Sequence, residues 1–323
     1  MGRHRVLVTA PLRGSGLDQL REVADVVLDP WIDHQPVRLY RAADLAARLT
    51  EVEADLLVCE ADDCRGPVFE QPLKAVASTR GDPTNVDLAG ATAAGIPVLH
   101  TPGRNADGVA EMAVALLFAV NRHLVLGDRD MRAGTVFTGT LPYQRYRTWQ
   151  LAGRTAGLVG LGAVGLATRW RLEGLGMKII ASDPYQPDGD CELDELLAAA
   201  DVVSMHAPIT PETLGMIGAQ QFANMRPGTI YLNTARAGLH DTGALVDALR
   251  SGHLAGAGLD HVDGEVLPTD HPLTQLDNVV LTPHVGGATY DTEVNQTDMV
   301  VEDILRLLAG KRPHRLANPE VWQ

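Results

Sequence analysis

The sequence predicts an α/β fold with two doubly wound parallel sheets, each covered by helices on both faces. Short apolar runs rich in β-branched residues alternate with helical stretches along the whole chain, a pattern typical of βαβ units. The chain has 323 residues, which is more than one hydrophobic core usually supports, so two domains are expected. All-α and all-β folds are therefore excluded, and so is a single small module.

The first half of the chain carries five expected strands and two expected helices. The strands fall in residues 5–10, 24–29, 54–60, 73–79 and 96–102, and a helix is expected over residues 42–49. Apolar residues at helical spacing then predict a long helix over residues 106–124. Residues 130–150 lack clean periodicity and are expected to form an irregular connection.

The second half contains six expected strands, enough for a complete dinucleotide-binding sheet. They fall in residues 155–162, 177–183, 201–206, 229–235, 254–260 and 278–284. In open parallel sheets, ligands bind outside the carboxyl ends of the strands, so the residues at these ends are the candidates for a binding site. Polar and ionisable groups gather there: Gly160 and Gly162, Asp183, His206 with Pro208, Arg236, Asp260 with Glu265, and His284.

Three glycines form a predicted phosphate-binding turn. Gly160, Gly162 and Gly165 spell GLGAVG between an expected strand and an expected helix over residues 163–175, where backbone amides can hold a pyrophosphate. Asp183 ends the next strand, where a carboxylate can accept the ribose hydroxyls of NAD and repel a 2′-phosphate. No Arg or Lys lies in residues 184–190, which favours NAD over NADP. The simpler alternative is a glycine-rich turn with a solvated aspartate.

Arg236, Glu265 and His284 follow three successive strands and suit hydride transfer. Oxidation of a secondary alcohol requires removal of the hydroxyl proton, and histidine can carry that proton in both directions near neutral pH. A nearby carboxylate favours the imidazolium, and an arginine can grip a substrate carboxylate through two hydrogen bonds. Taken singly, each residue has a common structural alternative: a surface salt bridge, a solvated loop or a core histidine.

Several of these stretches closely resemble the D-2-hydroxyacid dehydrogenases, which are D-isomer-specific and NAD-dependent. The resemblance rests on LVGLGAVG, ASDPY, HAPITPETLGMIGAQQFANMRPGTIYLNTARAG, GAGLD followed by Glu265, DHPL and NVVLTPHVGG. It implies a Rossmann NAD-binding domain and a flavodoxin-like substrate domain. It also implies that Arg236, Glu265 and His284 are catalytic, and that Asp260 holds the nicotinamide amide.

Further site residues are predicted from the motifs together with this resemblance. The predicted cofactor-binding residues are Gly160, Gly162, Ala163, Val164, Asp183, His206, Pro208, Thr234, Ala235, Asp260 and Gly286. Arg80, Gly81 and Asp82 are predicted to face the substrate carboxylate together with Arg236. For His206, and for His100 at an earlier strand end, a packing role is the competing interpretation.

The resemblance also implies a discontinuous first domain and a homodimer. The last helix, expected over residues 289–310, would return to complete the substrate domain. The predicted domains are therefore residues 1–103 plus 288–323 for substrate and residues 104–287 for NAD. In this family the dimer forms through the cofactor domain.

Some positions depart from the family pattern. Ala237 replaces a usual glycine, His240 a usual valine, His261 and Val262 a usual Val-Phe pair, and Val266 a usual proline. None of these removes a predicted catalytic group. They do put the shape of the Glu265 loop in question, and His261 could compete with His284 for the carboxylate of Glu265.

The substrate is predicted only as a small 2-keto or 2-hydroxy acid. The acidic stretch over residues 59–63, where phosphoglycerate dehydrogenases of the family carry basic residues, is expected to repel phosphate. Tyr143, Arg145, Tyr146 and Arg147 suggest either a contribution to binding a polar, sugar-acid-like substrate or a subunit contact. The alternative function is an NAD(H)-sensing binding protein without turnover, similar to the corepressors of this fold.

Composition excludes other classes of partner. The chain has 27 basic and 41 acidic residues, so its formal charge of −14 is the wrong sign for a nucleic-acid-binding protein. Three cysteines without CxxC spacing, and histidines without HxH or HxxxH pairs, predict neither disulfides nor a metal site. No apolar run approaches the roughly 20 residues of a membrane span, and the N-terminus lacks a signal-peptide pattern. A cytoplasmic location is expected.

Overall fold

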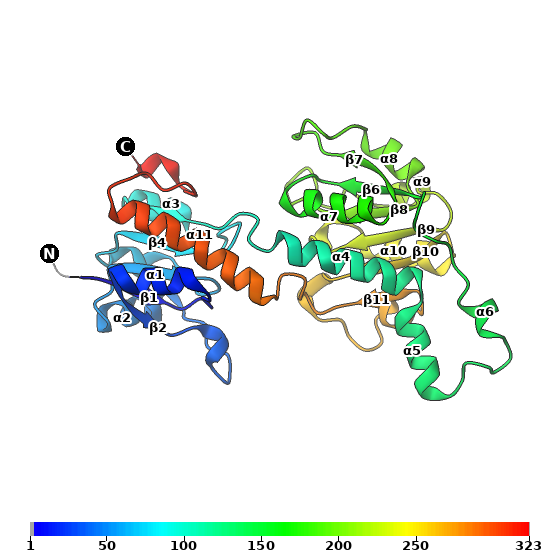
Figure 1. Cartoon of the computed structure of the whole chain (residues 1–323), viewed down its shortest axis with the longest axis horizontal. Helices are drawn as coiled ribbons and strands as arrows, with labels where there is room; N and C mark the ends of the chain where they lie inside the picture. Colours follow the sequence, from blue (N-terminus) through cyan, green and yellow to red (C-terminus); the bar gives the residue numbers. More distant parts are fainter. Residues whose placement is uncertain (1–2, 323) are drawn as a thin grey trace. The chain divides into compact units, whose positions relative to one another are not determined.

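The computed structural model describes residues 3–322, which form two compact units (Figure 1). Unit 1 contains the described residues up to Arg104 together with those from Thr289 onward, and unit 2 spans Asn105–Ala288. Each unit is a parallel sheet with helices on both faces. The predicted α/β class with two doubly wound sheets is confirmed.

Unit 1 is built on a five-stranded parallel sheet in the order β2-β1-β3-β4-β5. Its strands are β1 (His4–Val8), β2 (Ala24–Leu28), β3 (Leu56–Cys59), β4 (Ala75–Ser78) and β5 (Val98–Leu99). Each strand lies in one of the five segments predicted for it, apart from a start one residue early in β1. The strand order is the flavodoxin-like one.

Alternating side chains of this sheet supply two separate cores. Val6 and Val8 of β1 face α1 (Ser15–Val23) and α11 (Tyr290–Leu308). Leu7, between them, faces the other core, which contains α2 (Ala42–Glu51), η2 (Gly66–Glu70) and α3 (Leu88–Ala93). Because α11 packs against α1, the end of the chain completes the core begun at the N-terminus.

Unit 2 is built on a six-stranded parallel sheet in the order β11-β10-β9-β8-β6-β7. All six predicted strands are present: β6 (Thr155–Val159), β7 (Lys178–Ser182), β8 (Val202–Met205), β9 (Thr229–Asn233), β10 (Leu254–Leu259) and β11 (Val279–Leu281). The chain runs from β6 outward to β7 and then returns to the other side of β6 with β8. This reversal of strand order is the place where ligands bind in such sheets.

Two layers of helices enclose the unit 2 sheet. One core joins the sheet to α4 (Ala106–Asn121) and α7 (Ala163–Gly174). The other joins it to α8 (Leu193–Ala199), α9 (Ala219–Asn224) and α10 (Thr242–Arg250). The remaining short helices of the two units are η1 (Trp31–Asp33), η3 (Ala237–Leu239), η4 (Asp263–Glu265), η5 (Pro272–Gln275) and η6 (Pro319–Val321).

Residues 124–149, called the arm below, follow α4 in unit 2 and differ in part from the prediction. The expected helix over residues 106–124 ends at Asn121, and a second helix, α5 (Leu124–Ala133), begins after His123, whose φ of 52° breaks the helical path. Residues 130–133 are therefore helical, where an irregular segment was predicted. The pattern was missed because Leu124, Val125 and Met131 of α5 are exposed and form no buried stripe. A short helix, α6 (Pro142–Arg145), comes next on the arm (Figure 1).

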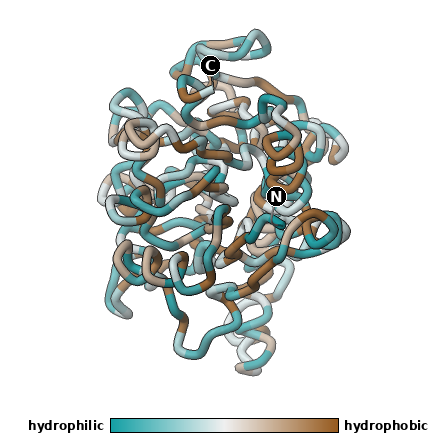
Figure 2. Tube along the Cα trace, turned by 90° about the vertical axis from the view of Figure 1, so that its left-hand side faces the viewer, coloured by the Kyte–Doolittle hydropathy of each residue, from teal (hydrophilic) through white to brown (hydrophobic). Residues whose placement is uncertain are grey.

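Hydrophobic residues lie mainly in the interior of each unit. In Figure 2 the peripheral loops are mostly hydrophilic, whereas hydrophobic colours follow strands and helices. Among residues 3–322, no single helix is long and apolar enough to cross a membrane. The pair α4 and α5 reaches the length and composition of a span only across a 54° bend, and much of α4 is core.

Candidate active site

The glycine turn of unit 2 forms as predicted, directly between β6 and α7. Gly160 has a φ of 99°, and a Cβ there would lie 2.8 Å from the backbone of residues 206–207. A Cβ on Gly165 would lie 2.2 Å from the carbonyl oxygen of Gly160. At Gly162, by contrast, a Cβ would meet none of the described atoms within 4 Å, so this side of the turn is open. The open space faces the N-terminus of α7, next to Ala163 and Val164, which suits a pyrophosphate.

Asp183 lies beside this turn, at the end of β7. Its carboxylate accepts hydrogen bonds from the backbone N–H groups of Leu161 (2.7 Å) and Tyr185 (2.9 Å). Each oxygen keeps a further lone pair for a ribose hydroxyl. One cation does approach the next segment of the chain: Arg169 of α7 lies 3.4 Å from Asp188. The sequence pattern missed it because Arg169 comes from the preceding helix.

His206, at the end of β8, lies against the glycine turn. Its Nε2 lies 2.9 Å from the Ser204 hydroxyl, and its Cβ would be 3.7 Å from a Cβ on Gly165. Burial lowers the pKa of His206 to about 4, so the ring is neutral at pH 7. Within residues 3–322 its Nδ1 has no hydrogen-bond partner, and the same is true of the buried hydroxyl of Thr234. Pro208 is exposed two residues further on.

Asn233 shapes the turn that carries Arg236, a role the sequence reasoning missed. Its side-chain oxygen accepts the N–H groups of Ala235 (3.0 Å) and Arg236 (3.2 Å), and its amide nitrogen donates to the carbonyl of Arg236 (2.8 Å). Asn233 is fully buried at the end of the apolar strand β9, and that isolated polar residue was the available signal. The guanidinium of Arg236 is exposed and donates to the carbonyl of Ala235, leaving other N–H donors for an anion.

Glu265 and His284 are brought together from two separate loops. The Nδ1 atom of His284 lies 3.0 Å and 3.1 Å from the two carboxylate oxygens of Glu265. Both residues have positive φ, 63° for Glu265 and 54° for His284, which is uncommon for residues other than glycine. Strained backbone of this kind is concentrated at functional sites. The pair leaves Nε2 of His284 for another partner.

Asp260 fixes the loop that carries His284. Its carboxylate accepts hydrogen bonds from the hydroxyl of Thr282 (2.6 Å) and from the N–H groups of Val285 (3.0 Å) and Gly286 (2.8 Å). A Cβ on Gly286 would lie 2.9 Å from the same carboxylate, which explains the glycine. Thr282 was not predicted as a site residue, because a threonine after a strand carries no distinctive pattern.

His261 lies against His284, with ring centroids 3.7 Å apart and planes inclined by 49°. Burial lowers the pKa of His261 to about 4, and the positive charges of His284 and Arg236 act in the same direction. The carboxylate of Glu265 hydrogen-bonds to His284, whereas within the described residues His261 has no such bond to it. Competition for Glu265 is therefore decided in favour of His284 in this structure.

The predicted substrate segment of unit 1, Arg80 to Asp82, comes after β4. The carbonyl of Arg80 accepts a hydrogen bond from the N–H of Thr101 (2.9 Å). The carbonyl of Gly81 accepts a hydrogen bond from Nδ1 of His100 (2.8 Å). Residues after β5 thus hold this segment in place. His100 supports the loop, in agreement with the packing interpretation.

The acidic stretch after β3 does not present the free negative charge expected from the sequence. Glu60 forms an ion pair with Arg104 at 2.6 Å. Asp62 is fully buried and accepts a hydrogen bond from Thr9 at 2.6 Å. Asp63 is paired with Arg65. The expectation that this stretch repels phosphate therefore loses its basis, because each charge is buried or paired.

The aromatic and basic residues before β6 fold back onto α5. Arg145 and Tyr146 both donate to the carboxylate of Asp130, at 2.9–3.0 Å and 2.7 Å. Their hydrogen bonds lower the pKa of Asp130. Tyr143 and Arg147 make no such contact among the described residues, and Tyr143 is exposed.

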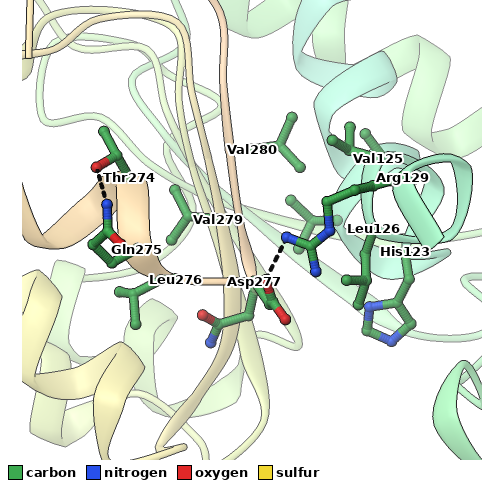
Figure 3. A pocket seen from close by; sticks show the side chains of 13 residues that line it. His123, Val125, Leu126, Arg129, Thr274, Gln275, Leu276, Asp277, Val279 and Val280 are labelled. Carbon is green, nitrogen blue, oxygen red and sulfur yellow. Dashed lines mark hydrogen bonds and ion pairs between the residues drawn. The ribbon is translucent and has the colours of Figure 1, made fainter. Parts of the chain in front are cut away.

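A cavity of about 400 Å³ lies elsewhere in unit 2 (Figure 3). It is lined by residues of α4, α5, the segment leading into β11 and β11 itself, and the ion pair between Arg129 and Asp277 (2.8 Å) crosses it. Its lining residues include none of Arg236, Glu265 and His284. The cavity therefore lies apart from the predicted catalytic residues.

Comparison with known proteins identifies the family. The model for the D-isomer specific 2-hydroxyacid dehydrogenase NAD-binding domain matches residues 114–286, more than half of the chain. The chain belongs to the D-isomer specific 2-hydroxyacid dehydrogenases. It is therefore similar to oxidoreductases that bind a nicotinamide cofactor.

Individual members of the family are similar over almost the whole chain. A glyoxylate reductase of Thermofilum pendens is 36% identical, over 99% of this chain and 96% of that protein. A D-3-phosphoglycerate dehydrogenase of Mycobacterium leprae is 40% identical over 95% of this chain, which spans only 57% of that longer protein.

Solved structures similar in sequence share the fold. The TT0316 protein of Thermus thermophilus has a TM-score of 0.82 at 39% identity, covering 97% of this chain and 99% of that one. An NADPH-dependent glyoxylate/hydroxypyruvate reductase of Sinorhizobium meliloti has a TM-score of 0.77 at 27% identity, covering 98% and 99%. Relatives with this fold therefore include an NADPH-dependent reductase.

Proposed function

We propose that this protein is an NADH-dependent reductase of small 2-keto acids, producing D-2-hydroxy acids. The observation that supports this most is the pairing of His284 with Glu265 at 3.0 Å, next to the strand ends that carry Arg236 and the glycine turn. Proton transfer, anion binding and dinucleotide binding are then available at one edge of one sheet. The similarity to glyoxylate reductases favours the same reaction class.

In the proposed reaction, each residue has a separate task. Nicotinamide supplies the hydride when bound. His284, protonated and held by Glu265 through Nδ1, gives a proton from Nε2 to the carbonyl oxygen of the keto acid. Glu265 stabilises the charged ring, and Arg236 binds the carboxylate of the keto acid and polarises its carbonyl. In the reverse direction His284 removes the hydroxyl proton.

The cofactor we propose is NAD. Support comes from the Asp183 carboxylate, which is fixed by two backbone N–H groups beside the open turn at Gly162. A 2′-phosphate would meet this negative charge. Arg169 approaches the segment after Asp183, and its ion pair with Asp188 offsets its charge. We also assign Thr234, Ala235, Asp260 and Gly286 to the nicotinamide end, with His206 and Pro208 lining the cofactor side.

For the whole protein we propose a homodimer in the cytoplasm, with residues 1–103 and 288–323 as substrate domain and residues 104–287 as cofactor domain. The arm of unit 2 supports the dimer, because Phe137, Leu141 and Trp149 are 76%, 60% and 72% exposed. Exposed apolar side chains gathered in one segment usually mark a contact surface. Arg80, Gly81 and Asp82 are the proposed substrate-binding residues of unit 1.

The direct test is a panel of 2-keto acids with NADH and with NADPH. Glyoxylate, hydroxypyruvate, longer keto acids and sugar-derived keto acids should be assayed for oxidation of the cofactor. We expect at least one of them to be reduced, with NADH preferred. If none is reduced above background while NADH still binds, the protein is better described as an NADH-binding protein without turnover.

A further inference from the structure

Three metal-binding side chains meet in unit 2, although the sequence spacing predicted no metal site. His261, Glu265 and His284 each offer a ligand atom, and these atoms all lie within 4.8 Å of one another. His261 and Glu265 come after β10, whereas His284 comes after β11, so only the folded sheet brings them together. A search for closely spaced histidines could not detect this arrangement.

His261 is the member that changes the chemistry of the cluster. The residue is only 4% exposed, and its ring lies against the ring of His284, with centroids 3.7 Å apart. The Glu265–His284 pair explains two of the three residues as an acid–base pair, but it does not explain a second imidazole beside them.

We propose that His261, Glu265 and His284 bind one divalent transition-metal ion, for which Zn²⁺ is the best match, and that the ion inhibits the enzyme. Two imidazoles and one carboxylate form a common set of ligands for zinc sites with an open fourth position. Zinc–ligand distances of about 2.0–2.2 Å place tetrahedral ligand atoms roughly 3.4 Å apart, so the cluster needs a modest contraction. Glu265 and His284 are exposed, which leaves them free to adjust and gives the ion access from solvent.

The ion inhibits because His284 would have to serve both as a metal ligand and as the proton donor. An imidazole that coordinates the ion through one nitrogen is no longer the acid that donates a proton, and Glu265 is occupied as well. This part of the inference rests on the proposed function, whereas the binding of the ion does not. Mg²⁺ prefers oxygen ligands in octahedral geometry and should not be held by two imidazoles.

The test measures zinc binding by the full chain, independently of turnover. After treatment with chelator and its removal, the protein is titrated with ZnCl₂ by calorimetry at pH 7, with MgCl₂ as the comparison ion. We expect one Zn²⁺ per chain at this site and no comparable binding of Mg²⁺. His261→Val, which removes one of the three ligands and adds no polar group, should weaken zinc binding by about tenfold or more.

Two further variants keep the test decisive. Glu265→Gln changes an exposed side chain, so it should weaken zinc binding without the risk of disturbing a buried ring. His314→Val removes a histidine that lies 3.7 Å from Glu302 in unit 1, and it should bind zinc as the unaltered protein does. Equal zinc affinity in the unaltered protein, His261→Val and Glu265→Gln would overturn the proposal, and so would the absence of zinc binding.

Activity then separates this inference from the proposed function. With an active keto acid, zinc should inhibit reduction in the unaltered protein, and His261→Val should need about tenfold more zinc for the same inhibition. Zinc binding at this site without any reductase activity would leave the metal site standing and refute the proposed function. Reductase activity insensitive to saturating zinc would refute the inhibition.

Discussion

The backbone N–H of Gly286 donates to the carboxylate of Asp260 at 2.8 Å, and this bond links the loops that come after β10 and β11. The same carboxylate also accepts hydrogen bonds from Thr282 and Val285, on both sides of His284. The position of His284 therefore depends on a buried carboxylate that is 1% exposed. Because neighbouring loops carry Glu265 and His284, Asp260 keeps the two within hydrogen-bonding distance.

Asp260→Asn should destabilise this arrangement. An amide offers one acceptor oxygen in place of two, and its NH₂ group would face a donor. We expect the free energy of unfolding to fall by about 1–3 kcal/mol and the affinity for NADH to decrease. Chemical denaturation and NADH titration measure the two effects. Unchanged values in both experiments would mean that Asp260 neither holds the loop nor contributes to the cofactor site.

Asp183→Ala should relax the discrimination between NADH and NADPH. The substitution removes a ribose contact and the charge that repels a 2′-phosphate, and it leaves Arg169 nearby. We expect weaker NADH binding and relatively stronger NADPH binding, measured as dissociation constants. Glu195→Ala, an exposed carboxylate on α8, is the control and should change neither. Tight NADPH binding by the unaltered protein would contradict the assignment.

The arm of unit 2 should determine the oligomeric state. Phe137→Asp combined with Leu141→Asp places charges on exposed apolar positions of the arm. We expect the unaltered protein to sediment at twice the 34.6 kDa of one chain and the variant to sediment as a monomer. Ile32→Asp, at a half-exposed apolar position of unit 1, should remain dimeric. A monomeric unaltered protein at micromolar concentration would refute the dimer.

Unit 2 should lose stability in acid because of its buried histidines. Burial lowers the pKa values of His206, His240 and His261 from 6.5 to about 4. Below pH 6.5 the unfolded chain therefore takes up protons that the folded chain does not, so the free energy of unfolding should fall as pH drops from 6.5 towards 4. Protonation of His240 would also break the hydrogen bond that its Nδ1 accepts from Asn233 at 3.0 Å.

His240→Val tests this origin. The variant should show a shallower dependence of unfolding free energy on pH between 6.5 and 4, whatever its stability at pH 7. His253→Val, at a partly exposed position of the same unit, is the matched variant for loss of a histidine, and its slope is measured alongside that of His240→Val. An unchanged slope in His240→Val would remove His240 from the account.

The strands and the glycine turn could be predicted because each depends on local pattern. The apolar strand that ends before Gly160 and the helix that begins after Gly162 are both recognisable in the sequence, so the turn between them could be predicted. The arm could not be predicted in the same way, because α5 has no buried stripe to produce a periodic signal. The pairing of the acidic residues after β3 could not be predicted, because the ion pair of Glu60 with Arg104 joins residues distant in the chain.

In the candidate site, too, some residues could be predicted from the sequence and others could not. Arg236, Glu265 and His284 were predicted from strand ends and resemblance, and the structure brings Glu265 and His284 into contact. The hydrogen bonds by which Asn233 shapes the Arg236 turn were missed, and His261 was expected near Glu265 but not against the ring of His284. Both depend on where side chains point after folding, and neither residue belongs to a motif with its own spacing.

The central claim is that His284 donates the proton during keto-acid reduction, and His284→Ala tests it most directly. With the best substrate of the panel, kcat should fall by about 10²–10⁴-fold, while the dissociation constant for NADH, measured on the same sample, should remain unchanged. A kcat close to that of the unaltered protein would contradict the claim and remove His284 from the chemistry.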